Sequence, residues 1–241
     1  MLVFSYGIPK SGSTLTFRIA TCAAVLGGHR QPMMRDELRI ARGHPHNFAQ
    51  ELDPAVLPDL AERFRDRLLI IKTHARPGLA WTAAYKVLAA HGLVSAHVNH
   101  RDPRDICLAL LDAGTKARAK GEAAFSEFVT MNDAVAAVRR YLGELAVWAG
   151  LPNVLVLRYE IAGFRTDEAI DSIKAHLGVR CPNWAVRFYL RHIAFTHRNK
   201  AVPERHRAEL DPATAARLTG IFGPYLRVMG YEPELETAAA E

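Results

Sequence analysis

The chain has 241 residues, of which 49% are hydrophobic and 23% are charged, and its formal net charge is +6 at pH 7. This length suits one domain with a substantial core, so we expect a single domain over residues 1–241. No stretch approaches the roughly 20 apolar residues of a membrane span, and basic residues are interspersed with acidic ones, so a cytoplasmic protein that does not bind nucleic acid is expected.

The spacing of cysteines and histidines argues against disulfides and against a metal centre. Cys22, Cys107 and Cys181 lie far apart in the sequence, without a Cys-x-x-Cys pair, so we expect them to be reduced. His44 and His46 form a close pair, separated by one residue. A metal site needs more ligands than this pair provides, so no metal is expected.

The N-terminal segment predicts a strand, a tight loop and a helix. Residues 2–4 are apolar, the loop that follows contains Gly7 and Gly12, and residues 13–26 carry the dense apolar pattern of a helix packed on a sheet. In such a loop glycines let the backbone approach an anion, and the amides at the start of the helix donate hydrogen bonds to it. The segment is therefore predicted to bind a phosphate or sulfate group.

The loop departs from the nucleoside-triphosphate pattern Gly-x-x-x-x-Gly-Lys-[Ser/Thr] at one position. Gly7, Gly12 and Thr14 fit this pattern. Ser13, however, occupies the position of its lysine, and the lysine of this chain is Lys10. The run Pro9-Lys10-Ser11-Gly12-Ser13-Thr14 resembles the 5′-phosphosulfate loop of sulfotransferases that use 3′-phosphoadenosine 5′-phosphosulfate (PAPS), a family that usually has Thr in place of Ser13. The resemblance implies that the donor is bound by Lys10, Ser11, Gly12, Ser13 and Thr14.

A second match follows a helix predicted at residues 53–67. Residues 68–71 form a continuous apolar run typical of a buried parallel strand, and Lys72-Thr73-His74 comes directly after it. Because ligands of open α/β sheets bind at the carboxyl ends of the strands, Lys72 and His74 are predicted to point into the same crevice. The string resembles the Lys-Thr-His that closes the corresponding strand of cytosolic sulfotransferases.

A third match lies at Arg101. A helix is predicted at residues 81–91 and a strand at residues 94–100, after which Arg101-Asp102-Pro103-Arg104-Asp105 opens a helix that continues to residue 115. This string resembles the family's 3′-phosphate motif, in which the first arginine, here Arg101, holds the 3′-phosphate of PAPS. The family has a serine where this chain has Ala109, and the loss of one neutral hydrogen bond costs roughly 0.5–1.5 kcal/mol.

The remaining elements include one further match. The apolar patterns predict a strand at residues 154–157 and helices at residues 122–150, 166–177, 182–191 and 211–229. Arg158-Tyr159-Glu160 follows the strand and resembles the family's Tyr-Glu-Asp, with Ile161 in place of the Asp. The resemblance places Tyr159 near the adenine.

Two alignments remain open in the late part of the chain. Arg198-Asn199-Lys200 can stand for the family's late basic motif without its glycine, and Arg198 would then bind the nucleotide. Alternatively, His192-Ile193-Ala194-Phe195 matches an earlier stretch whose aromatic residue, here Phe195, packs on the adenine. The two alignments exclude each other in part.

The order of strands and helices predicts a three-layer α/β/α fold with a mostly parallel central sheet and right-handed crossovers, and by resemblance this is the P-loop-like fold of the sulfotransferases. The resemblance implies transfer of a sulfuryl group from PAPS to a hydroxyl or amine of a small-molecule or glycan acceptor. In this reaction His74 is the general base, Lys10 stabilises charge on the oxygen that leaves with adenosine 3′,5′-bisphosphate (PAP), and Lys72 assists at the sulfuryl group.

Two other functions compete with this interpretation. A P-loop phosphotransferase with a degenerate loop would turn over ATP with Mg²⁺, but Ser13 stands in the position of its lysine. A nucleotide-binding protein of the same fold without turnover is favoured by Ala109 and by the glycine missing from the late basic motif.

Overall fold

The computed structural model describes residues 1–40, 44, 46–194 and 202–231. Its contacts divide the chain into two compact units. Unit 1 comprises Met1–His100 and Arg140–Arg198, and unit 2 comprises Arg101–Arg139 and Asn199–Glu241. The single domain over residues 1–241 stays a prediction.

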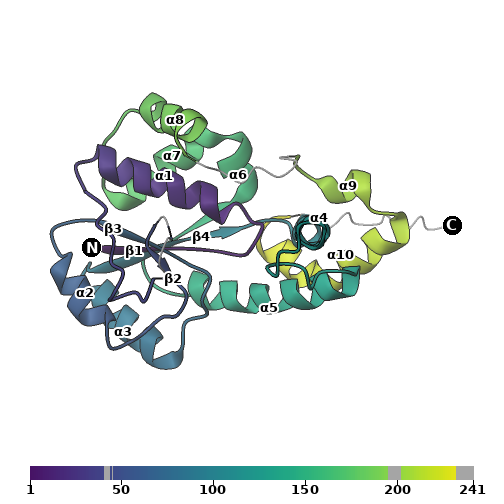
Figure 1. Cartoon of the computed structure of the whole chain (residues 1–241), viewed down its shortest axis with the longest axis horizontal. Helices are drawn as coiled ribbons and strands as arrows, with labels where there is room; N and C mark the ends of the chain where they lie inside the picture. The colour runs from purple at the N-terminus through teal and green to yellow at the C-terminus, as the bar shows by residue number, and fades with distance from the viewer. Residues whose placement is uncertain (41–43, 45, 195–201, 232–241) are drawn as a thin grey trace. The chain divides into compact units, whose positions relative to one another are not determined.

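Unit 1 is built on a five-stranded sheet in which all neighbouring strands are parallel, in the order β2-β3-β1-β4-β5 (Figure 1). β1, β3 and β4 are buried along their whole length, as expected for strands covered on both faces. The strands are β1 (Leu2–Gly7), β2 (Phe48–Ala49), β3 (Leu69–Thr73), β4 (Val94–His100) and β5 (Val154–Arg158).

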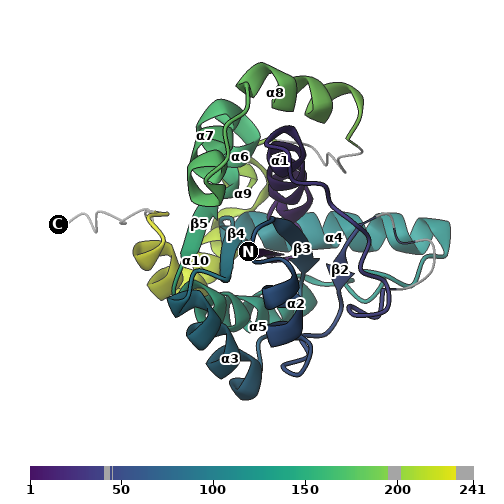
Figure 2. The same ribbon diagram turned by 90° about the vertical axis from the view of Figure 1, so that its left-hand side faces the viewer.

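Helices cover both faces of this sheet, as Figures 1 and 2 show from two directions. One face carries α1 (Ser13–Leu26), α6 (Tyr159–Phe164), α7 (Thr166–Leu177) and α8 (Asn183–His192). The other face carries α2 (Leu57–Arg63), α3 (Leu79–Ala90) and the unit 1 part of α5 (Met131–Ala149). The predicted three-layer fold with a parallel sheet is therefore confirmed.

The alternating side chains of β1 show why both faces are covered. Val3 packs into an aliphatic core with Phe17 of α1 and Ile170 of α7. Phe4, the next residue, points to the other face, where its ring centroid lies 5.1 Å from that of Trp81 and 6.0 Å from that of Trp148. Successive residues of a strand point to opposite faces, so this short apolar strand supplies both cores.

Unit 2 contains α4 (Pro103–Lys120), α9 (Arg205–Glu209), α10 (Pro212–Val228) and the first part of α5. Two aspartates define where its long helices begin. The carboxylate of Asp102 accepts a 2.9 Å hydrogen bond from the Arg104 amide, and that of Asp211 accepts one of 2.9 Å from the Thr214 amide. Both satisfy amides that have no partner within their own helix.

The long helix predicted at residues 122–150 is wrong in its first third. Gly121 ends α4 in the left-handed conformation, with φ 67°, and Phe125 also has a positive φ of 72°. α5 begins at Met131, where the Asp133 carboxylate accepts a 2.7 Å hydrogen bond from the Thr130 amide. The apolar residues before Thr130 belong to a connection and not to a helical face.

Four further elements differ from the predictions. β2, α6 and α9 were not predicted, and α2 covers a shorter range than residues 53–67. The three cysteines are free in this structure. Within the described ranges no helix has both the length and the apolar character needed to cross a membrane, and no cluster of three or more potential metal ligands occurs.

Candidate active site

The loop between β1 and α1 is a tight turn held together by Ser11. The amide and the hydroxyl of Ser11 both donate to the Ile8 carbonyl, at 3.0 and 2.7 Å, and its hydroxyl also lies 3.3 Å from the Asn99 carbonyl of β4. Lys10 and Gly12 have left-handed φ angles of 70° and 81°. Ser11 thus supports the loop from within, while the backbone on either side of it takes conformations that curl the chain around a concave space.

Gly12 and Tyr159 lie against each other. A Cβ atom on Gly12 would lie 2.5 Å from Cδ2 of Tyr159, so no larger residue fits here without displacing the ring. Tyr159 is the first residue of α6 and also packs edge-on against Phe164, with 5.8 Å between ring centroids. The sequence placed Tyr159 after a strand, and the structure brings it to the loop.

The loop leads into the N-terminus of α1 without any neutralising acid. Gly12 occupies the N-cap position and makes no side-chain capping bond, and the first turn contains no acidic residue. The amides at a helix start lack partners within the helix, and the helix dipole adds partial positive charge there. Together with the hydroxyls of Ser13 and Thr14, this end of α1 fits an anion.

Lys72, near the end of β3, reaches the loop. Its ammonium group donates a 2.9 Å hydrogen bond to the Thr14 hydroxyl, and the side chain is 7% exposed. Burial, together with the charge of Arg18 on α1, lowers the Lys72 pKa to about 8. The lysine is therefore mostly charged at neutral pH, in a partly desolvated position where its field acts strongly.

His74 contacts the other end of the loop. Its Nδ1 lies 2.7 Å from the Gly7 carbonyl oxygen. Because a carbonyl only accepts, Nδ1 carries the proton of the neutral ring, and Nε2 is left with its lone pair. Burial and the charge of Lys72 lower the His74 pKa to about 4, while the bond to Gly7 opposes this shift. His74 is therefore neutral at pH 7 and has one defined proton-accepting atom.

An aromatic side chain packs against His74. Phe48 of β2 packs edge-on against His74, with 5.5 Å between ring centroids, and His44 stacks on Phe48 at 5.1 Å. The indole N–H of Trp148 donates a 3.0 Å hydrogen bond to the carbonyl of Ala75, the residue after His74. These contacts restrict the orientation of the residues that follow β3.

Arg101 belongs to unit 2, where its own helix positions it. Its Nη2 lies 3.1 Å from the Asp105 carboxylate and 3.3 Å from the Val202 carbonyl, and the residue is 5% exposed. Asp105 is held in turn by the amide and Nδ1 of His206, both at 2.9 Å. Ala109 is buried in the same helix and offers no hydroxyl group.

The predicted residues of the late basic motif, Arg198 and Lys200, lie outside the described residues, as does Phe195. Arg205 of unit 2 was not singled out from the sequence. In the structure it is buried, with 2% of its surface exposed. Its guanidinium lies 2.8 Å from Asp112 and 2.7 Å from Glu209. These two carboxylates balance its charge within unit 2.

Comparisons with known proteins support the fold. No protein-family model and no curated protein matches the sequence. Solved structures do match. Mouse sulfotransferase SULT7A1 complexed with PAP has a TM-score of 0.55 at 12% identity, covering 93% of this chain and 84% of that chain. Retinol dehydratase with retinol and PAP gives 0.54 at 14% identity, with 93% and 81% covered. The sulfotransferase domain from the curacin biosynthetic pathway gives 0.53 at 13%, with 96% and 98% covered.

Proposed function

We propose that this protein is a PAPS-dependent sulfotransferase, which transfers a sulfuryl group to a hydroxyl or amine of a small-molecule or glycan acceptor. The chain has the sulfotransferase fold, and its loop after β1 contains a lysine and no acidic residue. One observation supports this proposal most directly. Lys72 and His74, two residues apart, each contact the loop, at the Thr14 hydroxyl and the Gly7 carbonyl respectively. A charged lysine and a neutral, oriented histidine thus adjoin one anion-binding loop.

The residues of the loop fit the sulfated end of a nucleotide. The chain from Gly7 to Thr16 contains no Asp or Glu, and two left-handed residues shape its backbone. Lys10, Ser13, Thr14 and the start of α1 are proposed to hold the phosphosulfate. By resemblance, Arg101 is proposed to bind the 3′-phosphate through the geometry of its guanidinium, which matches phosphate oxygens. Tyr159 is proposed to adjoin the adenine.

His74 performs the proton transfer in this mechanism. Its Nε2 accepts the proton of the acceptor hydroxyl or amine as the acceptor oxygen or nitrogen bonds to sulfur. The Nδ1–H bond to the Gly7 carbonyl keeps the ring in this tautomer and stabilises the imidazolium that forms. Lys72 and Lys10 stabilise the negative charge that develops at the sulfuryl group and on the departing oxygen. PAPS supplies the activated sulfuryl group.

Calorimetric titration with PAP and with adenosine 5′-monophosphate, without added metal, tests the donor site. We expect PAP to bind more tightly, followed by transfer from PAPS to members of an acceptor panel. Tight PAP binding without turnover on a broad panel would leave a nucleotide-binding protein. ATP turnover that requires Mg²⁺ would favour the phosphotransferase.

Replacing Arg101 should weaken binding of the 3′-phosphate selectively. For Arg101→Ala we expect a loss of about 10- to 100-fold in PAP affinity, the size of one or two hydrogen bonds to a charged group, with little change for adenosine 5′-monophosphate. Arg101→Lys keeps a charge beside Asp105 and controls for folding, and Arg227→Ala, an exposed arginine of α10, is the matched control. Equal losses for both nucleotides in calorimetry would assign Arg101 another role.

The pH dependence of kcat/KM should be bell-shaped. His74 acts unprotonated, so its lowered pKa makes activity rise through about pH 4. Lys72 acts protonated, so activity should fall through about pH 8. Initial rates at low PAPS concentration, with the fold followed by circular dichroism at each pH, report these free-enzyme values. A profile that stays level from pH 7 to pH 10 would contradict the role of Lys72.

A further inference from the structure

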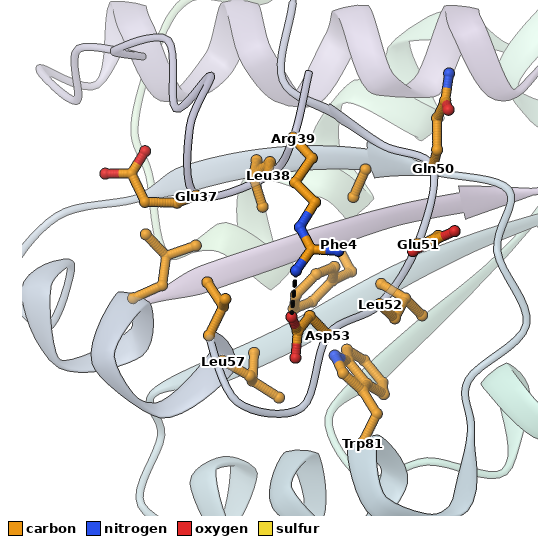
Figure 3. A pocket seen from close by; sticks show the side chains of 13 residues that line it. Phe4, Glu37, Leu38, Arg39, Gln50, Glu51, Leu52, Asp53, Leu57 and Trp81 are labelled. Carbon is orange, nitrogen blue, oxygen red and sulfur yellow. Dashed lines mark hydrogen bonds and ion pairs between the residues drawn. The ribbon is translucent and has the colours of Figure 1, made fainter. Parts of the chain in front are cut away.

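A cavity in unit 1 lies apart from the residues proposed for catalysis. It has a volume of about 280 Å³ and lies between residues 37–39, the segment after β2, the start of α2, and Trp81 of α3 (Figure 3). Lys10, Lys72, His74 and Tyr159 are not among its lining residues. This size is close to the lower end of about 300–1,000 Å³ for sites that hold small molecules.

The floor of this cavity is apolar and firmly supported. Phe4 and Trp81 form it together with leucine side chains, and the rings of Phe4, Trp81 and Trp148 pack against one another at 5.1–6.0 Å between centroids. The lining leucines are Leu38, Leu52, Leu57 and Leu60. A rigid aromatic floor keeps its shape and does not collapse into the space above it.

The indole N–H of Trp81 is the polar group of this floor. Trp81 is 2% exposed, and among the residues that the structure describes its N–H has no hydrogen-bond partner. Figure 3 shows the indole nitrogen on the pocket side of the ring, turned toward the part of the lining that holds Asp53. This donor is accessible and not fully buried, so an acceptor atom of a bound molecule can take its hydrogen bond.

The rim of the cavity is acidic. Glu37, Glu51 and Asp53 lie on it, against one lining base, Arg39. Glu37 pairs with Arg63 at 2.6 Å, and Asp53 pairs with Arg39 at 3.4 Å. Within the described part of the chain, Glu51 has no ion pair. The lining therefore carries an excess of negative charge over an apolar floor.

Arg39 can leave its position at modest cost. Its side chain is 74% exposed and reaches Asp53 across the cavity, as Figure 3 shows. Exposed ion pairs of this kind contribute about 0–1 kcal/mol. An incoming cation can therefore take over Asp53 while Arg39 turns to solvent.

We propose that this cavity binds a small organic cation: an amine with an apolar, preferably aromatic body and one hydrogen-bond acceptor. The ammonium group pairs with Glu51 and Asp53, the body lies on Phe4 and Trp81, and the acceptor meets the Trp81 N–H. Trp81 also offers a ring that attracts cations. The proposal is independent of the proposed sulfotransferase activity, because the cavity contains none of the residues assigned to it.

Three probes of matched shape test this by calorimetry on the full chain without nucleotide. 4-Methoxyphenethylamine carries the amine and the acceptor, 4-ethylphenethylamine replaces the ether oxygen by CH₂, and 3-(4-methoxyphenyl)propanoate replaces the ammonium by a carboxylate. We expect the first to bind most tightly. The ethyl compound should be about threefold weaker, the loss of one neutral hydrogen bond, and the carboxylate at least about tenfold weaker, because repulsion replaces attraction.

Two variants of the cavity and two control variants locate the binding. Glu51→Gln should weaken the methoxy amine about threefold, as for a surface ion pair, and Glu127→Gln, an exposed acid of unit 2, should leave it unchanged. Ala49→Leu fills the cavity from β2 and should abolish binding, with thermal unfolding as the check that the variant folds. His74→Ala should bind the amine as the unmodified protein does.

The proposal is overturned by any of three results. The first is binding of the carboxylate as tight as that of the amine. The second is unchanged amine binding by Glu51→Gln and the folded Ala49→Leu variant. The third is loss of amine binding by His74→Ala. Equal affinity of the ethyl and methoxy amines would remove the hydrogen-bond acceptor from the class of ligand.

Discussion

His74→Ala should lower kcat by about 10²–10⁴, the contribution of a positioned general base, while PAP affinity stays nearly unchanged. The reason lies in the neutral ring, whose Nδ1–H is held by the Gly7 carbonyl at 2.7 Å and whose Nε2 accepts the proton. Steady-state kinetics with PAPS and a responsive acceptor, combined with calorimetry of PAP, measures both quantities. Added imidazole should restore part of the rate, because it replaces the base that alanine removes.

His91→Ala is the matched control, since His91 is exposed at the end of α3. It should leave kcat and PAP affinity as they are. A large loss of PAP affinity in His74→Ala with kcat unchanged would show that His74 contributes to nucleotide binding and is not the general base.

Lys72→Met should lower kcat/KM by about 10²–10³, the usual cost of removing one donor that stabilises charge in a transition state. Methionine keeps much of the shape of the buried stem and removes the charge. The same variant should lose the fall in kcat/KM near pH 8, because the group whose pKa is lowered to about 8 is gone. Initial rates across pH 5–10 measure both effects.

Lys86→Met, on the exposed side of α3, is the matched control and should behave as the unmodified protein does. The affinity of Lys72→Met for PAP separates two roles of the charge. If PAP affinity falls as much as kcat/KM, Lys72 contributes ground-state binding and not transition-state stabilisation.

The layered fold could be predicted from the sequence where local signals agree. The helix at residues 13–26 and the strand at residues 94–100 were predicted with the bounds that the structure shows for α1 and β4. In both cases an apolar pattern of one period is bounded by glycine or by a capping motif. The parallel sheet follows from strands joined by helical crossovers, whereas the order of the strands within the sheet was not predicted.

The missed elements depend on contacts between distant residues. β2 has two residues and exists through its pairing with Lys72 and Thr73 of β3. The helix predicted at residues 122–150 failed because Phe125 and Phe128 look like a helical face, whereas they pack against each other in a connection, at 6.2 Å between ring centroids. Hydrophobic spacing alone does not separate these cases.

The candidate site could be predicted as a set of residues, but not as an arrangement. Lys72, His74 and the loop followed from motifs at strand ends. The tautomer of His74 and the lowered pKa values of both residues depend on burial and on the Gly7 carbonyl, which the sequence does not reveal. The contact of Phe48 with His74 depends on the pairing of β2 with β3, which local sequence patterns do not indicate.

β2 also constrains how this protein can change during evolution. Phe48 turns its side chain to His74, and Ala49, the next residue, lines the acidic cavity on the opposite side. A slip of β2 by one residue against β3 would exchange the two side chains, since neighbouring residues of a strand face opposite ways. A shift of this strand would therefore alter the surroundings of His74 and the acidic cavity together. The length of residues 29–47 can vary during evolution only where β2 keeps its pairing with β3.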